Sequence, residues 1–157
     1  RFVADSDYKF LLDARKMLME KVGKLEFPDA LLKRIMRLNN QDKDEKFVED
    51  NYDKSIEELT WHLIKEQLVK INDIKVEQDD ILNMAKETTR AQFAQYGMLS
   101  VPEEILDNYA KEMLKKKESI EGLVNRVVET KLASALKTQV TLENKSISAA
   151  DFNKMFE

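Results

Sequence analysis

Cysteine is absent from this chain of 157 residues, and glycine and proline are scarce, with three and two copies. Without cysteine the chain forms neither a disulfide framework nor a thiolate metal site, and it suits a reducing compartment. Proteins typically contain about 7% glycine and 5% proline. A chain this poor in helix breakers and rich in Leu, Lys, Glu and Ala is predicted to be almost wholly helical.

Long apolar runs and an excess of positive charge are also missing. No stretch approaches the 18 or so apolar residues that a membrane-spanning helix needs, so we expect no membrane partner. The net charge of −4 argues against nucleic acid, which selects a basic stripe. Lys115 to Lys117 is the only basic run, and it fits a helix C-terminus better than a phosphate site.

The sequence offers little for catalysis. The only histidine, His62, follows the only tryptophan, Trp61, in a segment with helical apolar spacing. Trp61 falls in the apolar sector and His62 outside it, where Glu58 and Glu66 are close enough to pair with the imidazole. No second His, Cys or Ser partner is nearby, which favours a solvated histidine over a metal ligand or acid–base group.

Phosphate and calcium sites are excluded on similar grounds. The three glycines are isolated, so no Gly-rich phosphate loop is possible. The segment from Asp42 to Glu45 resembles the start of a calcium loop, but the required glycine and closing glutamate do not fit. We therefore predict no catalytic residue, no metal and no cofactor.

Helix-start and helix-end signals divide the chain into a series of expected helices. Pro28 and Pro102 suit first turns, and Gly23 and Gly97 suit C-terminal ends. Ser55, three residues before Glu58, has capping-box spacing, so the Trp61 helix should begin near Ile56. The polar residues 39–54 before it are then a frayed helix or an exposed connector. The other expected helices span about 6–24, 28–38, 77–97, 102–117 and 119–140, followed by an extended segment, 140–148, and a small last helix.

Apolar residues gather where a turn would normally be polar, in "FAQYGMLSVPEEI". Such a corner either docks onto another element or presents apolar surface outward, and both alternatives remain open. Methionine, present seven times, suits surfaces that accept many shapes, although a place in the core is the competing interpretation for any one of them. The candidate contact residues are Phe93, Tyr96, Met98, Leu99, Val101, Ile105 and Tyr109.

The order of these features resembles the C-terminal domain of trigger factor, the ribosome-associated bacterial chaperone. The resemblance covers Tyr8 to Phe156 and rests on three segments in sequence. These are "FPDALLKRIMRL", "NDIKVEQDDILNMAKETTRAQFAQYG" and, most clearly, "VPEEILDNYAKEMLKKKESIEGLVNRVVETKLASALKTQVTLENKSIS".

The resemblance implies an elongated all-α domain with protruding helical arms and a short extended segment near the C-terminus. It implies ATP-independent holding of unfolded or nascent polypeptides in the cytoplasm, with no active residue in this domain. The ribosome-docking signature and the peptidyl-prolyl isomerase domain of the family are not found here. Residues 1–157 are thus interpreted as one C-terminal domain of a longer protein that reaches the ribosome through a missing N-terminal domain. A homodimer and the family's association with cell division are further expectations.

Two other functions compete with this hypothesis. One is a helical adaptor module that docks a single defined protein partner. The other is a helical enzyme with its site at His62. A periplasmic folding factor of related fold is a variant of the chaperone hypothesis, which only an N-terminal signal peptide would reveal.

Overall fold

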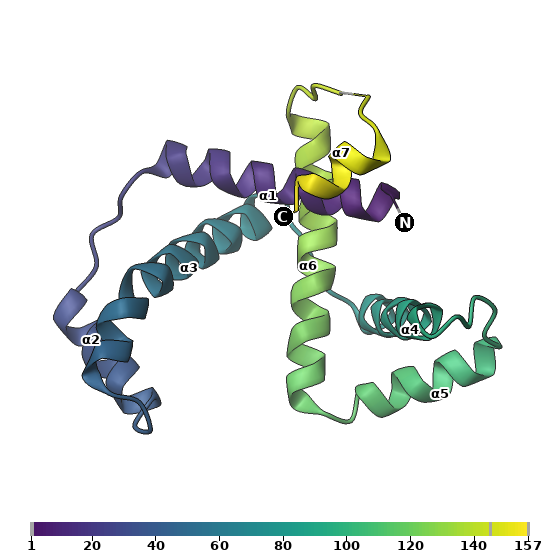
Figure 1. Cartoon of the computed structure of the whole chain (residues 1–157), viewed down its shortest axis with the longest axis horizontal. Helices are drawn as coiled ribbons and strands as arrows, with labels where there is room; N and C mark the ends of the chain where they lie inside the picture. The colour runs from purple at the N-terminus through teal and green to yellow at the C-terminus, as the bar shows by residue number, and fades with distance from the viewer. Residues whose placement is uncertain (1, 145, 157) are drawn as a thin grey trace.

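The computed structural model describes residues 2–144 and 146–156, and this part of the chain is helical without any β-strand. The predicted all-α class is confirmed. The helices, labelled in Figure 1, are α1 (Phe2–Val22), α2 (Asp29–Asn39), α3 (Glu45–Ile71), α4 (Gln78–Gln95), α5 (Glu103–Met113), α6 (Lys117–Gln139) and α7 (Ala149–Lys154).

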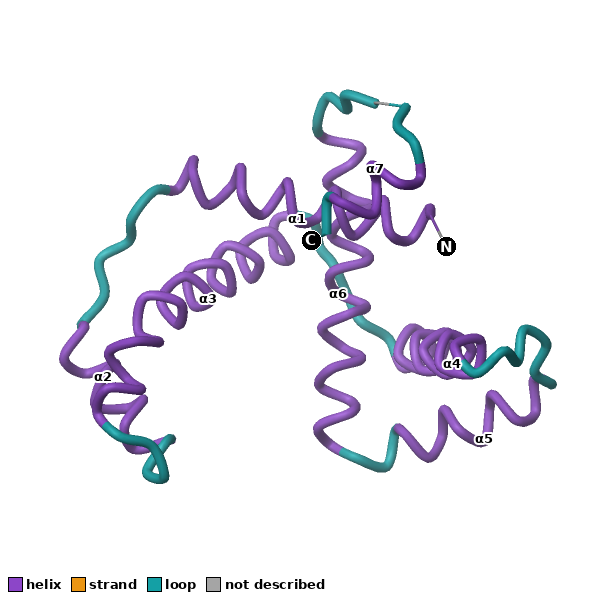
Figure 2. The backbone as a smooth tube through the Cα atoms, viewed as in Figure 1, coloured by secondary structure: helices purple, strands orange, loops and turns teal. Residues whose placement is uncertain are grey.

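Helix α6 is the central element, and two helical arms extend from it (Figure 1). Helices α2 and α3 pack together in one arm, and α4 and α5 pack together in the other. Helix α1 crosses α6 toward its C-terminal end, and the short α7 lies in the same region. Loops join these helices without further regular structure, as Figure 2 shows. The domain therefore has the protruding arms that the resemblance implied.

Two neighbouring positions on α6 account for the divergence of the arms. Lys65 of α3 forms an ion pair with Glu129 at 3.3 Å. Lys131 forms one with Asp80 of α4 at 2.5 Å and donates a hydrogen bond to the Lys75 carbonyl at 2.8 Å. Residues two apart on a helix point about 200° away from each other. Helices α3 and α4 are thus held on opposite sides of α6.

The molecule exposes far more surface than a compact protein of its size. Its accessible surface is 12013 Å², whereas a globular chain of 18.3 kDa would expose about 8100 Å². The buried apolar residues are correspondingly few and are spread over five helices. They are Leu11, Val48, Tyr52, Trp61, Ile64, Ala85, Leu106, Ala110, Leu123, Val127, Leu132, Ala133 and Leu136.

Helix α3 begins eleven residues before the predicted start at Ile56. Asp44 caps it, because its side chain accepts a hydrogen bond from the Phe47 N–H at 2.9 Å. Ser55 lies within the helix, so the capping-box prediction was wrong. The polar early turns are helical because Val48 and Tyr52 are buried in the arm, and the Tyr52 hydroxyl donates to Asp29 of α2 at 2.5 Å. Burial also raises the pKa of that hydroxyl to about 12.

The remaining boundaries follow the sequence signals more closely. Gly23 and Gly97 both have positive φ, at 71° and 81°, directly beyond α1 and α4. Residues 140–144 and 146–148 are non-helical, and the extended backbone of Val140 begins this segment as predicted. The Lys115 to Lys117 run crosses the turn between α5 and α6 rather than ending a helix, because α5 stops at Met113.

Candidate functional site

The end of the α4–α5 arm is built by a tight helix-terminating turn. The Met98 N–H donates to the Phe93 carbonyl and the Gly97 N–H to the Ala94 carbonyl, both at 3.0 Å. This pair of hydrogen bonds is a Schellman motif, which requires a left-handed residue at its C′ position. Gly97 meets that requirement, and Pro102 then precedes the first turn of α5. The chain between them, from Met98 to Val101, is held away from the rest of the molecule at the arm's end (Figure 2).

Buried contacts below the turn hold α4, α5 and α6 together. Ala85, Ala110 and Leu123 form a buried cluster that joins α4, α5 and α6, with Met84 and Met113 packed against it. Thr89 is buried at the same interface, and its hydroxyl donates to the Ala85 carbonyl at 2.8 Å. The arm therefore shares a core with α6, and its outer end does not contribute to that core.

Charged residues tie the two helices of the arm together along its edge. Lys86 forms ion pairs with Asp107 and, at 3.2 Å, with Glu103. Hydrogen bonds to these two carboxylates raise the pKa of the Lys86 ammonium. Arg90 also contacts Glu103, at 3.4 Å.

The structure brings the seven candidate contact residues together at the end of this arm. Leu99 and Tyr96 are 84% and 81% exposed, and Met98 is 53% exposed. Ile105 and Tyr109 are also exposed, while Phe93 and Val101 are half-buried. The ring of Phe93 packs edge-on against Tyr109 with 5.2 Å between centroids. The corner was expected either to dock onto another element or to present apolar surface outward, and in the structure it presents apolar surface outward.

A second exposed apolar surface lies on α2 and was not singled out from the sequence. No residue of α2 is buried, although five large apolar side chains recur on it. Leu32 and Met36 are half-buried, but Leu31, Ile35 and Leu38 are exposed. The available signal was the width of the apolar sector, which exceeds what one neighbouring helix can cover.

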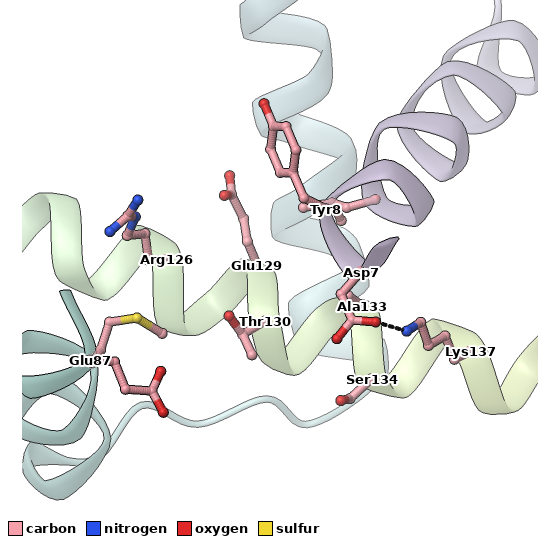
Figure 3. Close-up of a pocket in the computed structure, with 11 residues that line it drawn as sticks. Asp7, Tyr8, Glu87, Arg126, Glu129, Thr130, Ala133, Ser134 and Lys137 are labelled. Carbon is pink, nitrogen blue, oxygen red and sulfur yellow. Dashed lines mark hydrogen bonds and ion pairs between the residues drawn. The ribbon is translucent and has the colours of Figure 1, made fainter. Parts of the chain in front are cut away.

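A solvent-open pocket of about 440 Å³ lies between α1, α4 and α6 (Figure 3). Charged residues line it, including Glu87, Arg126 and Glu129, and an ion pair between Asp7 and Lys137 crosses one side. Residues 2–144 and 146–156 contain no group of three or more His, Asp or Glu side chains that could hold a metal ion. The pocket is a hollow of mixed character, since Leu11, Met84 and Ala133 line it beside the charged residues.

The Trp61–His62 pair occupies an ordinary stretch of α3. Trp61 is buried, with the Arg15 guanidinium 5.6 Å from its ring centre, and His62 is exposed. The expected pairing of His62 with two carboxylates was wrong, because both bind cations instead. Glu58 contacts Arg15 at 2.7 Å, and Glu66 contacts Lys70 at 3.5 Å.

Two helical arms that diverge from one helix and expose apolar side chains define an open class of all-α domain, which offers surface rather than an enclosed pocket. Within the described residues, no helix has the length and apolarity to cross a membrane. The sequence model of the family described as "Probable trigger factor, C-terminal domain" matches residues 6–156. The chain belongs to this family, as its resemblance indicated. No curated protein and no solved structure was found to match it.

Family membership supports a chaperone-related role. Within trigger factor, the C-terminal domain is the chaperone domain and is distinct from the prolyl isomerase domain. The family also suggests unfolded or nascent polypeptides as binding partners.

Proposed function

We propose that this domain holds unfolded polypeptides without ATP, through separate apolar surfaces on its arms. The observation that carries the proposal is the exposure of Tyr96, Met98 and Leu99 together at the end of the α4–α5 arm. A monomeric soluble protein rarely leaves contiguous apolar side chains uncovered unless they bind something. Because these side chains are already exposed, a client can bind them without a preceding rearrangement of the arm.

The expected affinity of such a surface is modest. Burying one large apolar side chain contributes roughly 1.5–3 kcal/mol, and much of that is offset by the ordering of client and side chains. Several surfaces of this kind, engaged by one flexible client, increase the overall affinity through effective concentration. Weak contacts at each surface also permit release by dissociation alone.

The setting of the domain is part of the proposal. It acts in the cytoplasm as a single C-terminal domain of a longer protein, and any ribosome contact is made by a region outside residues 1–157. Pairing into a homodimer stays a prediction, as does an association with cell division.

The end of the α4–α5 arm is tested by replacing Tyr96, Met98 and Leu99 together with Ser. We expect the variant to bind a denatured client about tenfold more weakly or worse, since each tenfold loss corresponds to only about 1.4 kcal/mol. Its thermal melting should remain close to wild type because these side chains are outside the core. The measurements are suppression of client aggregation and peptide-binding titrations.

The matched control replaces Val3, Val22 and Ile71, which are exposed singly on other helices, with Ser. It removes apolar surface without touching the arm's end and should hold clients normally. Equal losses in both triple variants would contradict the proposal, as would early melting of the first. A panel of unrelated denatured proteins separates a chaperone from an adaptor, because an adaptor would bind one partner and ignore the panel.

A further inference from the structure

The exposed face of α2 forms a continuous apolar stripe. Leu31, Ile35 and Leu38 are 54%, 42% and 57% exposed. Their spacing of four and three residues places them in one row along the helix. Leu32 and Met36 occupy a different side and are half-buried, so the packing of α2 on α3 leaves the stripe uncovered.

The basic residues of α2 give this stripe a positive edge. Lys33 is used in an ion pair with Glu49 at 2.5 Å, and Arg37 is 3.6 Å from Glu45. Arg34 is exposed and forms no ion pair within the described residues. It follows Leu31 by three residues and precedes Leu38 by four, so its guanidinium borders the stripe.

The end of the α4–α5 arm has the opposite charge at its edge. The only charged residues from 95 to 105 are Glu103 and Glu104. Glu103 contacts Lys86 and Arg90, whereas Glu104 is exposed and has no ion pair in the part of the chain that the structure describes. The two apolar surfaces therefore differ in the sign of their uncompensated charge.

We propose that the α2 stripe binds apolar segments of unfolded chains that carry Asp or Glu beside their apolar residues. This rests on the proposed function and adds a client chemistry to it. Charge complementarity selects this occupant, because no carboxylate among the described residues neutralises Arg34. A second copy of α2 is disfavoured as the occupant, since its stripe is bordered by the same uncompensated Arg34 and would bring like charges together.

The absence of cysteine allows a direct test. Single variants Ala30→Cys, on α2, and Ser100→Cys, at the end of the other arm, are labelled with an environment-sensitive fluorophore; both positions are exposed. Two peptides share one apolar sequence and are flanked by Asp or by Lys. At low salt we expect the Asp-flanked peptide to bind about two- to fivefold more tightly than the Lys-flanked one at the Ala30 label. The Ser100 label should not show that preference.

Charge reversal identifies the residue responsible. In the Ala30→Cys background, Arg34→Glu should remove or invert the preference for the Asp-flanked peptide. Lys16→Glu makes the same change in net charge on α1, where Lys16 is exposed, and should leave the preference intact. About 1 M salt should abolish the preference while apolar binding persists, because the Debye length is then only about 3 Å.

Each contrary result has a distinct meaning. The charge selection is overturned if the Ala30 label responds equally to both peptides, or if Arg34→Glu has no effect. In either case a responsive Ser100 label leaves the proposed function standing. Silence of both labels, together with failure to suppress aggregation, overturns the proposed function as well. A response of the Ala30 label to protein concentration alone assigns the stripe to a second copy and overturns the peptide proposal.

Discussion

At the scale of single residues, Asp73 stands out because its backbone is left-handed, with φ of 47°. It lies in the turn between α3 and α4, where the chain passes from one arm to the other. Asparagine and aspartate tolerate this conformation, whereas a β-branched residue meets its own carbonyl there. The direction in which the second arm leaves the first thus depends on a residue type that accepts this geometry.

Substituting this residue tests the backbone requirement. Asp73→Val should lower the free energy of unfolding by about 1 kcal/mol, since left-handed backbone costs roughly 1–2 kcal/mol in an ordinary L-residue. Asp73→Asn should stay within a few tenths of wild type because asparagine accepts the same φ. Urea unfolding followed by circular dichroism measures both. Equal stabilities of the two variants would show that the turn relaxes freely.

The conformation or environment of a single residue was predicted well where it depends on its near neighbours in the sequence. Gly97 was expected to end a helix by its conformational freedom, and it does so with the predicted positive φ. The environment of His62 was predicted less well, because Glu58 has a stronger partner in Arg15, 43 positions away. At the end of the α4–α5 arm, the sequence left two alternatives open, an apolar corner docked onto another element or one facing outward. It could not decide between them, because burial depends on how the helices pack together.

At the scale of elements, the start of α4 is joined to α6 through one carboxylate. Asp80 accepts a hydrogen bond from the Glu77 N–H at 2.8 Å, as part of a capping box, and also binds Lys131. The hydrogen bond from Lys131, followed by that from the backbone, lowers the pKa of Asp80 below its ordinary value of 3.8. The same side chain thus closes the helix end and attaches the arm.

The lowered pKa has a definite consequence for stability. The contribution of Asp80 is fully present above its unfolded pKa and is lost as the pH falls through its lower folded pKa. Asp80→Asn should therefore melt earlier than wild type at pH 7, and the difference should shrink below about pH 4. Thermal melts between these pH values provide the measurement.

Asp79→Asn is the matched control, because Asp79 is exposed in the same helical turn and makes no ion pair among the described residues. It should follow the wild-type acid profile. A difference between Asp80→Asn and wild type that persists unchanged at low pH would refute the role of the ionised Asp80.

The boundaries of helices with clear start and end signals were predicted to within a few residues, but the start of α3 was not. Its first turns are polar enough to look like a connector, and they are helical because α2 lies against them. Tyr52 bonds Asp29, 23 residues earlier, and Lys33 bonds Glu49. Tertiary contacts of this kind stabilise a helix beyond its intrinsic propensity, so local patterns cannot reveal them.

At the scale of the whole molecule, the open shape is the property that scattering can measure. A compact chain of 157 residues would have a radius of gyration of about 15 Å. The diverging arms predict a clearly larger value by small-angle X-ray scattering, at a protein concentration low enough to exclude association. A value near the compact expectation would mean that the arms fold together in solution, which would cover the surfaces proposed to hold clients.

The arms themselves were expected only from the resemblance to a family. Helical spacing identifies which residues are apolar, but it does not say which helix covers them. The decisive contacts join residues 51 and 64 positions apart, at Asp80–Lys131 and Lys65–Glu129. The apolar periodicity within one helix cannot reveal which residues of another helix it will contact.

The placement of those two pairs on α6 has a further consequence. One residue separates Glu129 from Lys131, and it sets the angle between the arms by the winding of a single helix. Inserting a residue there would rotate Lys131 by about 100° relative to Glu129. It would rotate Lys131 by the same angle relative to Leu123, which packs with Ala85 and Ala110 where the α4–α5 arm joins α6. Because the α4–α5 arm contacts α6 on both sides of residue 130, the span between the arm ends is fixed by an unbroken stretch of α6.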